Sequence, residues 1–210
     1  MSDSSMEEAR LQEWGGGTLP YSIPHIKLGM WLFIVSDALT FSGLLIAYAY
    51  LRVATPEWPM PFHLWPTIAM ASLMTFVLLS SSLTMVLGVN AAQRDDRKWT
   101  VLWTLFTALG GIIFMILHGQ EWAGLIHEGV TLTKNPWGTP LFGATFFGLT
   151  GLHMFHVFTG VVYLLVIAWG FSKKKFNSDH VEVCGLYWHF VDLVWMFVFP
   201  LVYLLSVKMD

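Results

Sequence analysis

The chain of 210 residues has little charge and almost no cysteine. Lys, Arg, Asp and Glu together make up 12% of the residues, whereas a typical soluble domain has about 25%. This shortage leaves too few polar side chains to cover a particle in water. Cys184 is the single cysteine, which excludes an internal disulfide and a zinc or iron–sulfur site built from cysteines of this chain. The net charge of −3 gives no reason to expect nucleic acid as a partner.

The sequence also lacks the common motifs of catalytic sites. It has no glycine-rich phosphate loop, no nucleophile–base signature and no H-E-x-x-H pair. Eight histidines are present, but none of their spacings makes a convincing haem or copper site. We therefore expect no catalytic centre, metal or redox cofactor within this chain.

Apolar residues are abundant and make up 55% of the chain. They include 11 tryptophans, a residue type that favours membrane interfaces. Five segments reach or approach the roughly 18–20 residues that span a bilayer. Lipid cannot satisfy an open strand edge, so each should be a helix. We predict an all-α integral membrane bundle over residues 28–207, with spans at about 28–51, 68–89, 100–119, 141–171 and 183–207. Residues 1–27 are expected to form a polar cytoplasmic tail without a secretory signal.

The basic residues predict the orientation of this bundle. With five spans, the N-terminal tail shares one side with the second and fourth connections. That side holds eight of the eleven Lys and Arg residues: Arg10, Lys27, Arg94, Arg97, Lys98, Lys173, Lys174 and Lys175. The positive-inside rule then places the N-terminus in the cytoplasm and the C-terminus outside.

Ionisable residues inside the spans are the most informative, because an unpaired charge at mid-membrane is costly. Asp37 lies near the middle of the first span. It is either a proton-titrating or interface carboxylate, or an acid hydrogen-bonded to a neighbouring helix. His189 and Asp192 are three residues apart and share a helix face, which we interpret as a structural cluster. His153 and His156 have the same spacing and could ligate a metal, but we favour hydrogen bonds between closely packed helices.

A further polar group is expected at the outer end of the third span. His118, Gln120 and Glu121 lie there, with His127 and Glu128 beyond. Such a group could form an external ion site. We favour an interfacial polar cap, which needs no ligand.

Three stretches resemble subunit III of the haem–copper terminal oxidases, the cytochrome c and quinol oxidases. Residues 29–37 (GMWLFIVSD) resemble the start of that family's third helix, and residues 144–157 (ATFFGLTGLHMFHV) resemble its glycine–histidine segment. Residues 187–195 (YWHFVDLVW) closely resemble its last-helix signature. The likeness covers roughly residues 26–205 in the family's order. The two extra N-terminal helices of seven-helix members have no counterpart, so the chain is similar to the five-helix bacterial form.

The resemblance implies a supporting subunit. In that family the haems and copper belong to subunit I, against which subunit III binds, and the complex oxidises cytochrome c or quinol, reduces oxygen to water and pumps protons. Subunit III is associated with sustained turnover and bound phospholipid. The resemblance thus implies an accessory subunit of the bacterial cytoplasmic (inner) membrane, whose partners are the other oxidase subunits and phospholipids. It leaves the electron donor open.

By position, the resemblance also implies which residues matter. Asp37 matches a membrane-buried carboxylate, which is Glu in the mitochondrial type. The basic turn matches a region that can hold lipid phosphate, with residues Lys173, Lys174 and Lys175. The remaining recurrent polar positions are Glu121, His153, His156, Glu182, His189 and Asp192.

Two other functions stay open on the sequence. An independent membrane haem protein could use His118, His153, His156 or His189 as axial ligands. A small proton-coupled transporter could be built around Asp37. Neither accounts for the last-helix resemblance.

Overall fold

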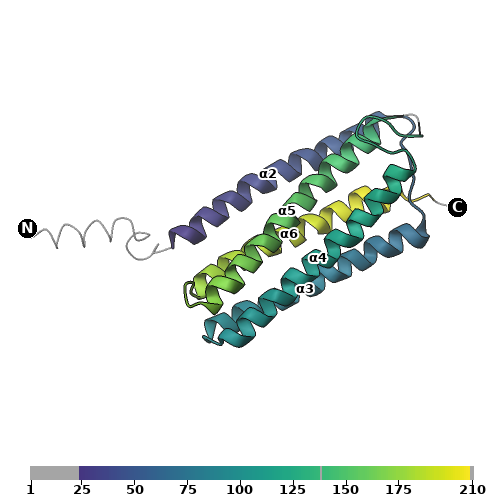
Figure 1. Ribbon diagram of the computed structural model, residues 1–210. Helices are drawn as coiled ribbons and strands as arrows, with labels where there is room; N and C mark the ends of the chain where they lie inside the picture. Colours follow the sequence, from purple (N-terminus) through teal and green to yellow (C-terminus); the bar gives the residue numbers. More distant parts are fainter. Residues whose placement is uncertain (1–23, 138, 209–210) are drawn as a thin grey trace, which may run out of the picture.

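The computed structural model describes residues 24–137 and 139–208. These residues contain five long helices, labelled as in Figure 1: α2 (His25–Ala54), α3 (Ala69–Gln93), α4 (Arg97–His127), α5 (Leu141–Ser172) and α6 (Ser178–Val198). A π-helical turn, η1 (Leu64–Ile68), precedes α3, and a second, η2 (Phe199–Tyr203), follows α6 and leads into the 3₁₀ turn η3 (Leu204–Ser206). In the described residues, β pairing is limited to a bridge between Phe62 and Val207. The predicted all-α class is confirmed.

All five helices are long and apolar enough to cross a membrane, counting η1 with α3 and the two terminal turns with α6. The predicted number of spans is therefore confirmed, and the differences lie at the ends. Helix α4 continues to His127, about two turns past the expected end at residue 119. Regular α-helix in α6 stops at Val198, not near 207, because Pro200 cannot donate a backbone hydrogen bond.

Short polar turns join α3 to α4 and α5 to α6. Helix α4 begins after Asp96, whose carboxylate accepts a hydrogen bond from the Trp99 backbone N–H at 3.3 Å. Helix α6 begins after Asn177, whose side chain accepts from His180 N–H at 3.4 Å. Such caps satisfy backbone donors that a helix start leaves free. These tight connections make each pair antiparallel neighbours.

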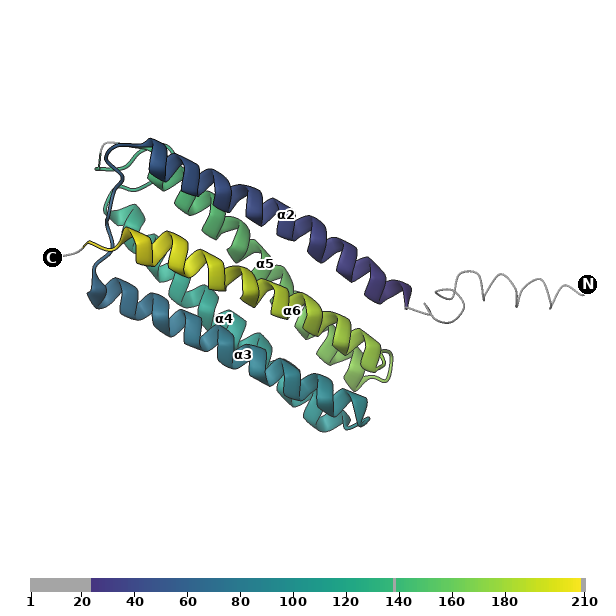
Figure 2. The ribbon, with the colours of Figure 1, turned by 180° about the vertical axis from the view of Figure 1, so that it is seen from behind.

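Helices α3, α4, α5 and α6 form a close-packed group, and α2 lies along one side of it (Figures 1 and 2). Helix α2 packs against α5 and α6. It buries only Ile34, Phe41 and Tyr48, whereas half of the apolar window of α5 and of α6 is buried. Most of the α2 surface is therefore free of contacts with the other described residues, 55–137 and 139–208.

The two ends of the bundle differ in charge. The start of α2, the α3–α4 turn and the α5–α6 turn lie at one end, and the C-terminus lies at the other (Figure 1). We call the first the basic end, because it carries Lys27, Arg94, Arg97, Lys98, Lys173, Lys174 and Lys175. The second and fourth connections thus lie at the same end as the start of α2, as the count of basic residues assumed. The orientation across the membrane stays a prediction.

A buried tryptophan fixes how closely the four helices approach. The indole of Trp188 is fully buried and donates its Nε1–H to Ser81 Oγ of α3 at 3.1 Å. A Cβ atom added at Gly111 of α4 would lie 2.5 Å from Trp188 Cη2, and one at Gly160 of α5 would lie 3.0 Å from the same ring. Glycine at these two positions lets α4 and α5 contact the indole directly.

This packing predicts that Gly111→Ala destabilises the bundle by about 1–3 kcal/mol, the usual cost of overpacking a core. Trp188 cannot retreat without losing its hydrogen bond to Ser81. Gly119→Ala on the same helix is the matched control, since a Cβ there meets no atom within 4 Å. Thermal unfolding in detergent, followed by helical circular dichroism, should show a lower midpoint for Gly111→Ala only. Equal midpoints for both variants would contradict the proposed role of Trp188.

Candidate functional site

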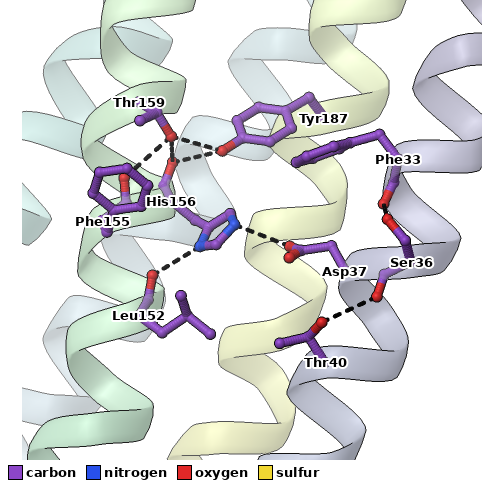
Figure 3. Close-up of polar contacts among 9 residues, drawn as sticks. All are labelled: Phe33, Ser36, Asp37, Thr40, Leu152, Phe155, His156, Thr159 and Tyr187. Carbon is purple, nitrogen blue, oxygen red and sulfur yellow. Dashed lines mark hydrogen bonds and ion pairs between the residues drawn. The ribbon is translucent and has the colours of Figure 1, made fainter.

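Two of the sequence-predicted residues, Asp37 and His156, meet between α2 and α5 (Figure 3). His156 Nε2 lies 3.1 Å from Asp37 Oδ2, and the two side chains are 10% and 13% exposed, respectively. The other ring nitrogen, Nδ1, lies 2.8 Å from the carbonyl oxygen of Leu152, one turn earlier on α5. That bond sets the ring orientation, so that Nε2 points toward α2.

The partners of His156 determine where protons must be. A carbonyl oxygen only accepts hydrogen bonds, so Nδ1 carries a proton. The approach of Nε2 to Asp37 Oδ2 has ion-pair distance but an imperfect hydrogen-bond direction. It is favourable only with a second proton between the two atoms, held by either one. In both arrangements the pair has no net charge, which lowers the cost of placing it inside a membrane.

Aromatic rings and hydroxyl groups surround this pair. The Phe41 ring lies edge-on to His156, with centroids 5.3 Å apart. Tyr187 of α6 donates its hydroxyl to the His156 carbonyl oxygen at 3.0 Å and lies 2.8 Å from Thr159 Oγ1 (Figure 3). A cavity of about 430 Å³ adjoins His156 and is lined mainly by aromatic side chains. The arrangement ties α2, α5 and α6 together and favours the interpretation of Asp37 as an acid paired with a neighbouring helix.

At the opposite end, Glu121 joins α4 to the turns that follow α6. Tyr203 donates its hydroxyl to Glu121 Oε2 at 2.7 Å, and His118 Nδ1 lies 3.1 Å from the same oxygen. His118 and Tyr203 are fully buried. His118 is thus an internal residue rather than part of a surface cap. Sequence reasoning missed Tyr203, because its partner lies 82 residues away.

His189 and Asp192 both lie on the side of α6 that faces α3. His189 Nδ1 lies 2.6 Å from Ser82 Oγ of α3, and the same hydroxyl lies close to Asp192. Asp192 is 5% exposed. Within the described part of the chain, neither of its carboxyl oxygens makes a well-formed hydrogen bond. Ser82 is therefore the group that the two residues share.

His153 does not join His156 in a common site. It is completely buried, with its ring stacked on Trp195 at a centroid distance of 5.2 Å and edge-on to Phe114 at 5.7 Å. Neither ring nitrogen has a hydrogen-bond partner in residues 24–137 or 139–208. Across these same residues, no group of three His, Cys, Asp or Glu side chains is arranged to hold a metal ion.

The remaining predicted residues lie at the basic end. Glu182 of α6 forms an ion pair with Lys27 of α2, at 2.5 Å between Oε1 and Nζ. Both side chains are about one-third exposed, and such pairs are typically worth about 0–1 kcal/mol. Lys173, Lys174 and Lys175 form the exposed α5–α6 turn. Lys175 Nζ lies 4.8 Å from the centroid of the Trp169 ring.

The proton arrangement at Asp37 leads to a prediction about two substitutions. Asp37→Asn can donate an amide N–H to His156 Nε2 and should be tolerated. Asp37→Leu leaves that buried nitrogen unpaired, which costs about 1–3 kcal/mol. Thermal unfolding in detergent should therefore separate the two variants.

The control for this prediction is the double variant Asp37→Leu/His156→Leu. Replacing both members of a buried polar pair by apolar residues is often close to neutral, so the double variant should regain much of the stability lost by Asp37→Leu. Equal losses for Asp37→Asn and Asp37→Leu would show that the contact does not hold α2.

The family model and the known proteins that match this chain all indicate one family. The family model of cytochrome c oxidase subunit III matches residues 14–207. Quinol oxidase subunit 3 of Bacillus spizizenii is 34% identical over 182 residues, which cover 85% of this chain and 86% of the relative. Cytochrome c oxidase subunit 3 of Bacillus sp. strain PS3 is 34% identical over 184 residues, 85% of each chain. The protein of that name from Synechocystis is 35% identical over 187 residues, 87% of this chain and 77% of the relative.

These matches confirm the resemblance that the three sequence stretches indicated. They agree with the five membrane-spanning helices in describing a multi-pass membrane protein. The matched region runs from the N-terminal segment through η3, so it includes every polar contact described above. The chain belongs to the cytochrome c oxidase subunit III family and is a subunit of a haem–copper oxidase.

Proposed function

We propose that this chain is an accessory, non-redox subunit that stabilises the catalytic subunit of a proton-pumping respiratory oxidase. The haems and copper then belong to partner subunits, and the chain contributes a wall of helices rather than a reaction centre. The observation that carries the proposal is the outward face of α2, which the described part of the chain leaves uncovered. The proposal covers quinol and cytochrome c as electron donors, since relatives named for quinol oxidase and for cytochrome c oxidase match at the same identity.

The uncovered face of α2 has a regular seven-residue pattern. Leu32, Leu39, Ile46 and Val53 follow one another at intervals of seven and are 65%, 70%, 69% and 87% exposed. A parallel row of exposed smaller residues has the same spacing: Gly29, Ser36 and Gly43. We call these seven residues the α2 seam. Apolar residues repeating every seven positions are typical of helices that pack along their length, and small residues let backbones approach closely in membranes.

The polar contacts of α2 support this use of the seam. Asp37 follows seam residue Ser36 directly, about 100° further round the helix, and points toward His156 (Figure 3). The Asp37–His156 contact therefore fixes the rotation of α2 about its own axis, and with it the direction of the seam. On this proposal Asp37 and His156 position a docking face and carry out no chemistry.

The basic end supports the proposed location. The chain is placed in the bacterial cytoplasmic membrane with the basic end in the cytoplasm, following the positive-inside rule. The exposed turn of Lys173, Lys174 and Lys175 is positioned to contact phospholipid phosphate there, since all three side chains are free of carboxylate partners in the described residues. The opposite end is then on the outer side.

Deleting the chain tests the accessory role. The remaining oxidase should keep its haem absorption spectrum, while oxygen consumption during continuous turnover declines faster than in the complete complex. Loss of the haem signal from the catalytic subunit would contradict the proposal. A Soret band in the purified chain alone would instead favour an independent haem protein.

The α2 seam yields a second prediction. Gly43→Leu should weaken co-purification of this chain with the catalytic subunit, because a bulky side chain separates the helices. Gly148→Leu on α5 is the matched control, because a Cβ at either glycine meets no atom of this chain within 4 Å. Equal recovery of both variants in the complex would place the interface elsewhere.

A further inference from the structure

A cavity of about 230 Å³ lies between α3 and α6 at the basic end. We call it the α3–α6 inlet. Asn90 and Gln93 of α3 line it from one side, and Glu182 and His189 of α6 line it from the other. Gly185 forms part of its wall. A Cβ atom added at Gly185 would lie 3.2 Å from the Val89 side chain. The inlet thus combines an open volume with four polar side chains in a region of apolar helix.

The deep end of the inlet leads toward a buried acid. His189 lines the inlet and contacts Ser82 at 2.6 Å. Ser82 in turn lies close to Asp192, one helical turn further along α6. The contacts therefore run in order from the inlet through His189 and Ser82 to Asp192.

Asp192 lacks the partners that its position requires. Its side chain is 5% exposed, and neither carboxyl oxygen has a hydrogen-bond partner in the described residues. None of the ion pairs in this part of the chain includes it. Burying a polar group without a hydrogen bond costs free energy, and ionisable groups inside membranes normally face a partner or a water-filled cavity.

We propose that the α3–α6 inlet holds water that reaches Asp192 past His189 and Ser82. A water molecule occupies about 30 Å³ in the liquid, so the inlet has room for several. Asn90, Gln93, Glu182 and His189 provide the polar partners that such waters need. Asp192 thereby exchanges hydrogen bonds and protons with the aqueous phase at the basic end, despite its depth in the bundle. This hydration does not depend on the accessory role proposed above.

Hydroxyl-radical footprinting of the intact oxidase complex tests the inlet. Radiolysis of bound water oxidises the side chains next to it, and mass spectrometry measures the rate at each residue. His189 should be oxidised severalfold faster than His153, which is a histidine of the same bundle that lines none of the cavities described here. Oxidation of His189 at or below the rate of His153 would overturn the proposal. This comparison needs no substitution.

Substitutions then test the path. Gln93→Leu makes the mouth of the inlet apolar and should slow oxidation of His189, whereas Gln120→Leu at the opposite end of the bundle should not. Asp192→Leu removes the polar group at the deep end and should also slow it, while Asp192→Asn keeps a group that water can bond and should leave the rate near that of the wild type. Only complexes with an unchanged haem spectrum are compared. Equal rates for Asp192→Leu and the wild type would show that water stops before Asp192.

Discussion

Hydrocarbon offers no hydrogen bonds, so polar groups inside the spans must find partners within the protein or in water that enters it. The aromatic side chains of α6 and η2 meet this constraint for most of the bundle. Trp188 and Trp195 donate to Ser81 and Thr75 of α3. Tyr187 contacts Thr159 of α5, and Tyr203 donates to Glu121 of α4. Each ring buries a large apolar surface and places one polar atom at a neighbouring helix. The last helix and the turn that follows it thus determine the positions of α3, α4 and α5.

Helix α2 depends on the same constraint in a different way. It buries few apolar residues, and apolar burial provides no hydrophobic driving force between helices in lipid. Polar contacts spread along its length attach it instead: Lys27 with Glu182, Asp37 with His156, and both Tyr48 and Arg52 with Ser206. Because these contacts all lie on the inward side, they leave the α2 seam uncovered. The same inward-facing polar contacts therefore attach α2 to its own bundle and leave its outer face available to a partner.

The sequence predicted the five spans because long apolar runs need no tertiary information. It also identified Asp37 and Asp192 as important, since ionisable residues in such runs are expensive, whereas Glu182 was indicated only by the family resemblance. It could not predict their partners. Helical spacing shows which residues share a face, but not which helix that face meets, and the contacts of Lys27 with Glu182 and of Ser82 with His189 join residues 155 and 107 positions apart. After Val198 the last span continues as a π-helical turn instead of as α-helix. This change depends on Pro200 and affects only the turns next to it.

The two buried acids show how one constraint can have two outcomes. Asp37 meets an imidazole whose other nitrogen is fixed by Leu152, so the pair is complete and ties two helices together. Asp192 meets only a serine hydroxyl that His189 already engages. On our proposal its remaining hydrogen-bonding capacity is met by water from the α3–α6 inlet, whose lining reaches as far as His189. A complete pair resists change in its surroundings, whereas a hydrated acid responds to the aqueous phase. The difference between a structural carboxyl and an exchangeable one is therefore set by the neighbouring helix, not by the acid itself.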